Sequence, residues 1–442
     1  MNDTNIEISQ EFLASHRKEF NKFKTDLDNL YTKNKNKIKI IALLDYWIFN
    51  ILLLKKIYGS RGLLNFCNSH IKNPQRFSFF YELNNLNKVK EIRLKKNKSK
   101  FFYVLKFFAN QIYVPGAHLD NFFKKILNYI SLKFILSIPA EIDENIQHKL
   151  NNILESIFHD KFSTSEINLV LKKIPLVFIS NLISMPLKKI TVSGSPSSFL
   201  EYEGFENIFL LDSNLHIEGI QHGGGYDIFK IDYFADYEKA LCDKFYGWGF
   251  SEENIHQTKF MKISNKTPSN IKRVLWIEDS KVPSFYFYSM PHHHQQSINI
   301  KSKEYIYKEL NSNKIEYTSM FHPASKSNLY KNFRRNDFDV PMGGQSEKNF
   351  FLNDILIFDN SGSTLIHCAI ENEMIFYQVI SRLDYENFTE LQKEFFLIQR
   401  KYNFGIFDDE ESKLSNSISN IKSNDNYCLP NDLIEFYRKY FK

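Results

Sequence analysis

The first part of the chain carries apolar residues at helical spacing. This spacing predicts helices over residues 7–35, 38–58 and 118–185, so we expect the region 1–185 to be mainly helical. Residues 38–58 are apolar enough to raise the question of a membrane span, but Asp45 near the middle of the stretch is costly in a bilayer. We therefore predict a buried helix there.

From residue 188 onward the pattern changes to short β-branched runs that end in glycine or serine. These runs predict strands followed by loops within residues 188–195, 215–225 and 243–250. After a polar stretch at 251–269 the pattern begins again. Strands are expected at 272–277, 315–321, 355–358 and 374–380, and helices at 301–311, from about 363, at 386–400 and at 432–441. Strands that alternate with helices at this spacing are typical of βαβ units and a parallel sheet.

The change of pattern and the polar stretch divide the chain into predicted domains. A length of 442 residues favours two domains over one. We predict an α/β protein whose N-terminal domain spans 1–255, helical over 1–185 and Rossmann-like over 186–255. A second Rossmann-like domain follows over 270–385, and residues 386–442 are predicted to be helices that pack back on the N-terminal domain. The cleft between the two Rossmann-like domains is the expected ligand site.

Composition and charge narrow the class of protein. Apolar residues make up 43% of the chain and charged residues 24%, as in globular proteins. The formal net charge of +6 is modest and no nucleic-acid-binding module is recognisable, so no nucleic-acid partner is expected. The basic runs at 33–39 and 88–100 predict solvated loops, with peripheral contact to the anionic inner membrane as the alternative. Four distant cysteines and a polar start without a signal peptide predict a cytoplasmic protein without disulfides.

Loops that follow the strands of a parallel sheet are where ligands bind. The sharpest candidate is residues 221–227 (QHGGGYD), in which three consecutive glycines allow a ligand to approach the backbone closely. His222 adds a titratable group to this loop. The alternative is a glycine turn beside a structural histidine. The other candidate loops are residues 193–196, residues 278–280, and the pair formed by 322–323 and 359–364.

Residues 358–364 (FDNSGST) predict a strand that runs into the start of a helix. Free amide groups and the helix dipole at such a start suit a phosphate, to which hydroxyl groups can add hydrogen bonds. Plain N-capping by Ser361 or Ser363 is the alternative. The dipeptide His322-Pro323 comes one strand earlier in the same predicted domain, and we expect it nearby. The three histidines at 292–294 lack acidic companions, so no metal site is predicted.

Three segments carry a resemblance to a known family. Residues 219–226 (GIQHGGGY), Glu238 and residues 243–249 (DKFYGWG) resemble the Q-H-G-G-x-Y-G, Glu and s-D-x-f-x-x-W-G-W series of bacterial surface-carbohydrate transferases. Those enzymes are related to the retaining β-Kdo transferases and, more distantly, to GT-B sialyltransferases. Asp227 stands where the family has Gly, and Phe250 stands where it has the last Trp.

This resemblance implies a GT-B-like glycosyltransferase of O-antigen, capsule or lipopolysaccharide biosynthesis. Its donor would be a CMP-activated 2-keto sugar acid such as CMP-Kdo, and it would need no metal or other cofactor. His322-Pro323 is similar to the His-Pro motif that CMP-sugar enzymes use at the donor phosphate, and Ser363-Thr364 is similar to their hydroxyl pair. The implied donor-binding residues are His322, Pro323, Ser361, Gly362, Ser363 and Thr364, and the implied residues facing a glycan or lipid-linked glycan acceptor are Gln221, Gly223, Gly224 and Tyr226.

Transfer from such a donor passes through an oxocarbenium-like state, in which a carboxylate acts as nucleophile or as base. The candidate carboxylates are Glu201, Glu203, Asp227 and Asp279, and His222 is the candidate acid, base or acceptor-positioning group. Two alternatives stay open. One is a UDP- or GDP-sugar enzyme, which would bind a diphosphate through basic residues such as Lys326, Arg334 and Arg335. The other is a non-catalytic carbohydrate-binding scaffold.

Overall fold

The structure is a computed structural model, and two compact units make up its fold. It describes residues 10–34, 37–72, 111–113, 140–172, 174, 178–182, 190–194, 215–221, 226–247, 273–278, 295–321, 340–341, 355–423 and 428–440. We call residues 13–222 with 233–246 the N-terminal unit, and residues 1–12 with 223–232 and 247–442 the C-terminal unit. The predicted domain boundaries stay a prediction.

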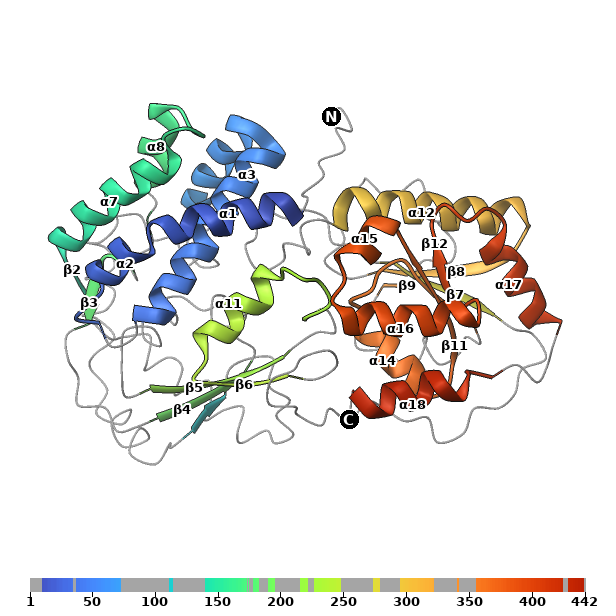
Figure 1. The fold of residues 1–442 in the computed structure, drawn as a ribbon. Coiled ribbons are helices and arrows are strands. Elements are labelled where there is room, and N and C mark those ends of the chain that lie inside the picture. Colours follow the sequence, from blue (N-terminus) through green and yellow to red (C-terminus); the bar gives the residue numbers. More distant parts are fainter. Residues whose placement is uncertain are drawn as a thin grey trace. The chain divides into compact units, whose positions relative to one another are not determined.

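The N-terminal unit combines helices with a parallel sheet (Figure 1). The sheet has the order β1-β4-β5-β6, with β1 (Gln111–Tyr113), β4 (Ile190–Gly194), β5 (Leu215–Ile220) and β6 (Lys244–Tyr246). A separate antiparallel pair consists of β2 (Ala140–Ile142) and β3 (Ser180–Leu182). The described helices are α1 (Gln10–Lys22), α2 (Lys24–Leu30), α3 (Lys37–Lys72), α7 (Glu144–Phe158), α8 (Thr164–Leu171) and α11 (Tyr233–Leu241).

Helix α3 contains the apolar stretch that we predicted to be a buried helix, and that prediction is confirmed. Leu43, Leu44 and Trp47 are fully buried, and the Tyr46 ring stacks on Tyr237 of α11 with 4.1 Å between the ring centroids. Gly59 has a φ of 62° and interrupts the helix, a conformation that glycine adopts without steric cost. Among the described residues, no helix is long and apolar enough to cross a membrane.

The C-terminal unit is built on a second parallel sheet with the order β12-β11-β10-β7-β8-β9. Its strands are β7 (Val274–Glu278), β8 (Tyr317–Phe321), β9 (Val340–Pro341), β10 (Ile355–Phe358), β11 (Ile375–Ile380) and β12 (Gly405–Phe407). Its helices are α12 (Gln295–Ser312), α14 (Thr364–Glu371), α15 (Arg382–Asn387), α16 (Glu390–Lys401), α17 (Lys413–Lys422) and α18 (Asn431–Tyr440). The predicted mixed α/β fold with parallel sheets is therefore confirmed.

The order of this second sheet determines its topological switch point. The chain runs from β7 through β8 to β9 in one direction, and then from β10 through β11 to β12 in the other. Every residue of the neighbouring strands β7 and β10 is buried, as expected for strands covered on both faces. Figure 1 shows α12 on one side of the sheet and α14 and α18 on the other. The topological switch point lies between β7 and β10, at the centre of this buried layer.

Several elements differ from the sequence-based predictions. The helical prediction over 118–185 is wrong at β2 and β3, because strands of three residues are too short to leave a recognisable period. The predicted helix 386–400 is interrupted at Phe388, where the backbone is extended and Thr389 caps α16. The prediction that residues 386–442 are helices is wrong at β12, which is a strand between α16 and α17. A Cβ at Gly405 of β12 would lie 2.9 Å from Phe396, so glycine permits the close approach of β12 to α16.

Candidate functional site

The described residues contain part of the predicted site. The predicted residues that lie outside them are Glu201, Glu203, His222, Gly223, Gly224, Asp279, His322 and Pro323. The roles predicted for these residues stay predictions. We call residues 221–227 the glycine loop. Its described members are Gln221, Tyr226 and Asp227, and the described members at the start of α14 are Ser361, Gly362, Ser363 and Thr364.

The two ends of the glycine loop are anchored in different units. Gln221 follows β5 in the N-terminal unit, is buried, and donates its backbone N–H to the carbonyl of Tyr246 at 3.0 Å. Tyr226 is buried in the C-terminal unit, and Asp227 beside it has a left-handed φ of 57°. The carbonyl of Asp227 accepts a hydrogen bond from the Thr389 hydroxyl at 3.2 Å. The structure therefore places Asp227 against the start of α16.

The segment after Asp227 is held on the C-terminal unit by its backbone. The N–H of Lys230 donates to the carbonyl of Asn387, and the N–H of Thr389 donates to the carbonyl of Ile228. Phe229 and Phe388 form an isolated antiparallel bridge, with their ring centroids 5.3 Å apart. These contacts hold residues 228–230, which follow the loop, against residues 387–389 at the start of α16.

The other residues of the resemblance series lie in the N-terminal unit. Glu238 is fully buried in α11. The carboxylate of Asp243 accepts from the Lys39 ammonium at 2.7 Å and from the N–H of Ile217 at 2.8 Å. Asp243 thus holds the turn before β6 against β5, which is a structural role.

The predicted phosphate-binding turn lies at the switch point of the C-terminal sheet. Ser361 and Gly362 connect β10 to α14, and the hydroxyl of Ser363 caps the helix by accepting from the N–H of Leu365 at 3.3 Å. Ser361 is 5% exposed, and its hydroxyl has no hydrogen-bond partner among the described residues. The N-capping alternative therefore holds for Ser363 and leaves Ser361 unexplained. The N–H groups of Leu365 and Ile366 donate to Ser363, so the features of this helix start that favour an anion are the helix dipole and the hydroxyl of Ser361.

A buried charged cluster lies beside that turn. The side chains of Glu278, Lys303 and Asp359 are fully buried, and the ammonium of Lys303 donates to the carboxylate of Asp359. The indole N–H of Trp276 also donates to Asp359, at 3.2 Å. The nearest oxygen of Glu278 lies 3.7 Å from the Lys303 ammonium, a contact that attracts the two charges without a hydrogen bond. We call Glu278, Lys303 and Asp359 the switch-point cluster.

Sequence reasoning identified the loops of this cluster but not its charged residues. Glu278 and Asp359 belong to loops 278–280 and 358–364, which the strand pattern had singled out. Lys303 gave no signal, because a lysine in a predicted helix is normally solvated. Its burial follows from the position of α12 over the sheet, which only the tertiary structure reveals.

Buried hydrogen-bond acceptors lie at the same edge of the sheet and, for Ser319, two positions inside it. Both carboxylate oxygens of Glu278, the amide oxygen of Asn360 and the hydroxyls of Ser319 and Ser361 lack hydrogen-bond partners among the described residues. Buried polar groups in folded proteins are paired in the large majority of cases. This edge therefore combines a helix start, whose dipole favours an anion, with groups that call for hydrogen-bond donors. Within the described part of the chain, no three His, Cys, Asp or Glu side chains converge as metal ligands.

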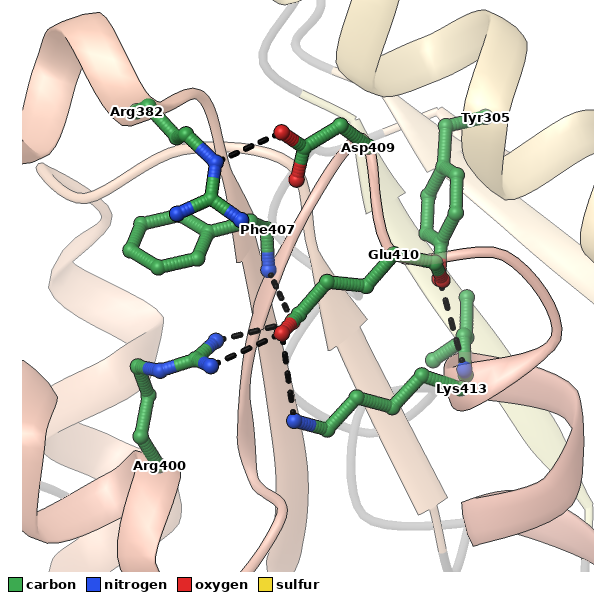
Figure 2. A network of polar contacts seen from close by, with 8 residues as sticks. Tyr305, Arg382, Arg400, Phe407, Asp409, Glu410 and Lys413 are labelled. Atoms are coloured by element: carbon green, nitrogen blue, oxygen red, sulfur yellow. Dashed lines mark hydrogen bonds and ion pairs between the residues drawn. The ribbon is translucent and has the colours of Figure 1, made fainter.

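A second polar cluster lies at the end of β12, and its groups are paired. Figure 2 shows Glu410 between Arg400 and Lys413. Arg400 donates two hydrogen bonds to the Glu410 carboxylate at 2.7 and 2.8 Å, and the backbone N–H of Phe407 donates a third at 2.9 Å. The guanidinium of Arg400 lies 4.3 Å from the centre of the Phe407 ring. We call Arg400, Phe407, Glu410 and Lys413 the β12 network. Hydrogen bonds from Arg400, above all, lower the pKa of Glu410 to about 2.

Comparisons with known proteins identify one protein family whose model matches this chain. The family model described as LIC12162 family transferase matches residues 7–339, which is most of the chain. No curated protein and no solved structure matches. The matched region includes the glycine loop and β7, and it ends before β10. The chain therefore belongs to the LIC12162 family of transferases.

Proposed function

We propose that the protein is a glycosyltransferase of the GT-B type that takes its sugar from a nucleotide donor. One observation carries this proposal: the start of α14, with the buried hydroxyl of Ser361, lies at the topological switch point of a six-stranded parallel sheet. Open sheets of this kind bind nucleotides beyond the carboxyl ends of their strands, with a phosphate at a helix start. Membership of a transferase family agrees with this proposal, because a nucleotide sugar carries the transferred group on a phosphate.

The donor that we propose is CMP-Kdo or a related CMP-activated 2-keto sugar acid. This finer assignment is supported by the resemblance of residues 219–226, Glu238 and residues 243–249 to the β-Kdo transferase series, and by the dipeptide His322-Pro323. The acceptor would be a glycan or lipid-linked glycan of a surface polysaccharide. The reaction would take place in the cytoplasm, with peripheral contact to the inner membrane.

The start of α14 suits the leaving group of such a reaction. As the glycosidic bond to phosphate breaks, negative charge grows on the phosphate while the sugar becomes oxocarbenium-like. In this proposal the positive end of the α14 dipole stabilises that growing charge, and the hydroxyls of Ser361 and Ser363 donate hydrogen bonds to it. A metal ion is not required for this charge compensation. Glu201, Glu203, Asp227 and Asp279 stay the proposed carboxylates, and His222 stays the proposed acid, base or acceptor-positioning group.

A nucleotide panel tests the proposal. We would titrate the full-length protein calorimetrically with CMP, CDP, UMP, UDP, GMP and GDP, and repeat the series with His322→Ala and Ser361→Ala. The proposal predicts selective binding of CMP that both substitutions weaken. Incubation with CMP-Kdo and an extracted glycan acceptor should then give a Kdo-extended product.

The same panel separates the alternatives. Tighter binding of UDP or GDP than of CMP would replace the proposed donor with a diphosphate sugar and keep the glycosyltransferase class. Absence of nucleotide binding at all concentrations would contradict the proposal and make the carbohydrate-binding scaffold the better account. A free-energy gain on binding appears as a rise in melting temperature, so thermal-shift measurements provide an independent readout.

A further inference from the structure

The switch-point cluster is unbalanced in hydrogen bonds. Asp359 accepts from both the Lys303 ammonium and the Trp276 indole. Glu278, which is 1% exposed, has a charge contact with Lys303 but no hydrogen-bond partner among the described residues for either oxygen. A buried carboxylate without donors is destabilising, because its hydration is lost and not replaced. The lack of hydrogen-bond donors at Glu278 therefore needs an explanation, whereas Asp359 has donors in Lys303 and Trp276.

The position of Glu278 points to that explanation. It is the last residue of β7, directly after Ile277, which pairs in register with Phe358 of β10. The next position along β10 is Asp359, so Glu278 and Asp359 are neighbours across the switch point. Trp276 pairs with Ser319 of β8, and alternation along the strand puts Trp276, Glu278 and Ser319 on the same face of the sheet.

The unpartnered atoms at this edge are mainly acceptors. They are the two oxygens of Glu278, the amide oxygen of Asn360 and the hydroxyl of Ser361, and the unpartnered hydroxyl of Ser319 lies two positions earlier along the sheet. The cluster also has two carboxyl groups for one lysine ammonium, so it has no surplus of positive charge. The complementary group is therefore a hydrogen-bond donor, an O–H or an N–H, carried by a ligand whose anionic part lies at the start of α14.

We propose that Glu278 is a ligand-binding residue that accepts hydrogen bonds from hydroxyl or amino groups of the nucleotide donor. This proposal rests on the proposed function, because it needs a nucleotide at this edge of the sheet. Lys303 and Asp359 act as positioning residues, since their ion pair leaves the oxygens of Glu278 unused. The donating group belongs to the ribose, to the amino group of the base, or to the transferred sugar.

Calorimetric titrations with Glu278→Gln test this assignment. The substitution keeps the size of the side chain and the Lys303–Asp359 pair, and replaces one acceptor oxygen with a donor. We would titrate the wild type and the variant with CMP, 2′-deoxy-CMP, UMP, CMP-Kdo and inorganic phosphate. We expect the variant to bind the cognate ligand about ten- to a hundredfold more weakly, and inorganic phosphate with unchanged affinity.

The analogues identify which group donates. A ribose hydroxyl is indicated if 2′-deoxy-CMP binds the wild type as weakly as CMP binds the variant. The base amino group is indicated if UMP does so instead. If the two proteins differ only for CMP-Kdo, the donating group is on the transferred sugar. The loss of affinity from CMP to 2′-deoxy-CMP or to UMP in the wild type alone does not depend on how well the variant folds.

A matched control separates binding from folding. Glu309 on α12 is also buried, but its carboxylate accepts from the N–H groups of Ser412 and Ser415 and from the Ser415 hydroxyl. Glu309→Gln should lower the melting temperature and leave nucleotide affinity unchanged. Equal affinities of wild type and Glu278→Gln for every nucleotide would overturn the assignment and leave a buried water as the partner. If the wild type binds none of the nucleotides, both this assignment and the proposed function fail.

Discussion

Two polar clusters lie at the carboxyl edge of one sheet, and they differ in how their glutamates are paired. In the β12 network, Glu410 accepts two hydrogen bonds from Arg400 and one from the backbone of Phe407, with Lys413 at 3.4 Å. In the switch-point cluster, Glu278 has only an ion contact with Lys303 at 3.7 Å. Glu410 is partly exposed, whereas the side chain of Glu278 is fully buried.

The comparison separates structural polar groups from candidate binding groups. A carboxylate near the surface whose acceptor sites are filled stabilises the fold, and removing it leaves its partners without hydrogen bonds. A more deeply buried carboxylate with empty acceptor sites is costly unless a ligand or water supplies the donors. By this criterion the β12 network holds β12 to α16, and the switch-point cluster is the candidate ligand site.

The largest effect on stability is expected in the β12 network. Glu410→Ala leaves the Arg400 guanidinium and the N–H of Phe407 without their acceptor, so the free energy of unfolding should fall by about 2–3 kcal/mol. Glu411→Ala is the matched control, because Glu411 is exposed and lies 3.8 Å from Lys308, and it should change stability by less than about 0.5 kcal/mol. Urea unfolding monitored by circular dichroism measures both. Similar losses of stability in Glu410→Ala and Glu411→Ala would contradict a structural role of the β12 network.

The pKa of Glu410 adds a pH dependence to the same network. Its folded pKa of about 2 lies below the ordinary glutamate value of 4.5, so its contribution to stability is present above about pH 4.5 and is lost as the pH falls toward 2. Between those pH values the wild type should lose stability faster than Glu410→Ala. Parallel stability curves for the two proteins would contradict this.

The next effect is expected at Asp384, with the opposite pH dependence. Burial, as the largest cause, raises the pKa of Asp384 from 3.8 to about 7. The folded state therefore binds this proton more tightly than the unfolded state, and stability falls as the pH rises from about 4 to 7. Asp384→Asn should be more stable than the wild type by about 1–3 kcal/mol near pH 8, with no gain near pH 4. Unfolding curves at the two pH values decide it, and an equal effect at both would exclude the titration of Asp384 as the cause.

A smaller effect is expected at the start of α14. Ser363→Ala removes the hydroxyl that accepts from the N–H of Leu365, so we expect a loss of about 1 kcal/mol in stability. Ser363→Asp is the informative companion variant, because aspartate restores the cap but repels an anion. If a phosphate binds here, Ser363→Asp should be as stable as the wild type and bind CMP much more weakly. Unchanged CMP affinity in Ser363→Asp would show that the phosphate does not bind at this helix start.

The smallest effect on stability is expected at Glu278. Because its oxygens have no hydrogen-bond partner among the described residues, Glu278→Gln should change the free energy of unfolding by less than about 1 kcal/mol in the absence of ligand. Chemical denaturation of the ligand-free protein measures this change. A loss as large as that of Glu410→Ala would mean that Glu278 is structural, and the contrast between the two clusters would fail.

Much of the C-terminal sheet could be predicted from the sequence, because buried parallel strands such as β7 and β10 are continuous apolar runs. The start of α14 could be predicted from its Ser, Gly and Thr residues, which favour helix N-termini. The short strand β12 could not, since three residues between two helices carry too little periodicity. The burial of Lys303 also escaped prediction, because it depends on the packing of α12 over residues more than fifty positions away.

Hydrogen–deuterium exchange of the full-length protein, with and without saturating CMP, tests the central claim most directly. The account predicts slower exchange of the backbone amides in residues 359–366, where a phosphate would accept hydrogen bonds at the start of α14, and unchanged exchange in residues 405–415 of the β12 network. Unchanged exchange in residues 359–366 at saturating CMP, or protection confined to 405–415, would contradict it.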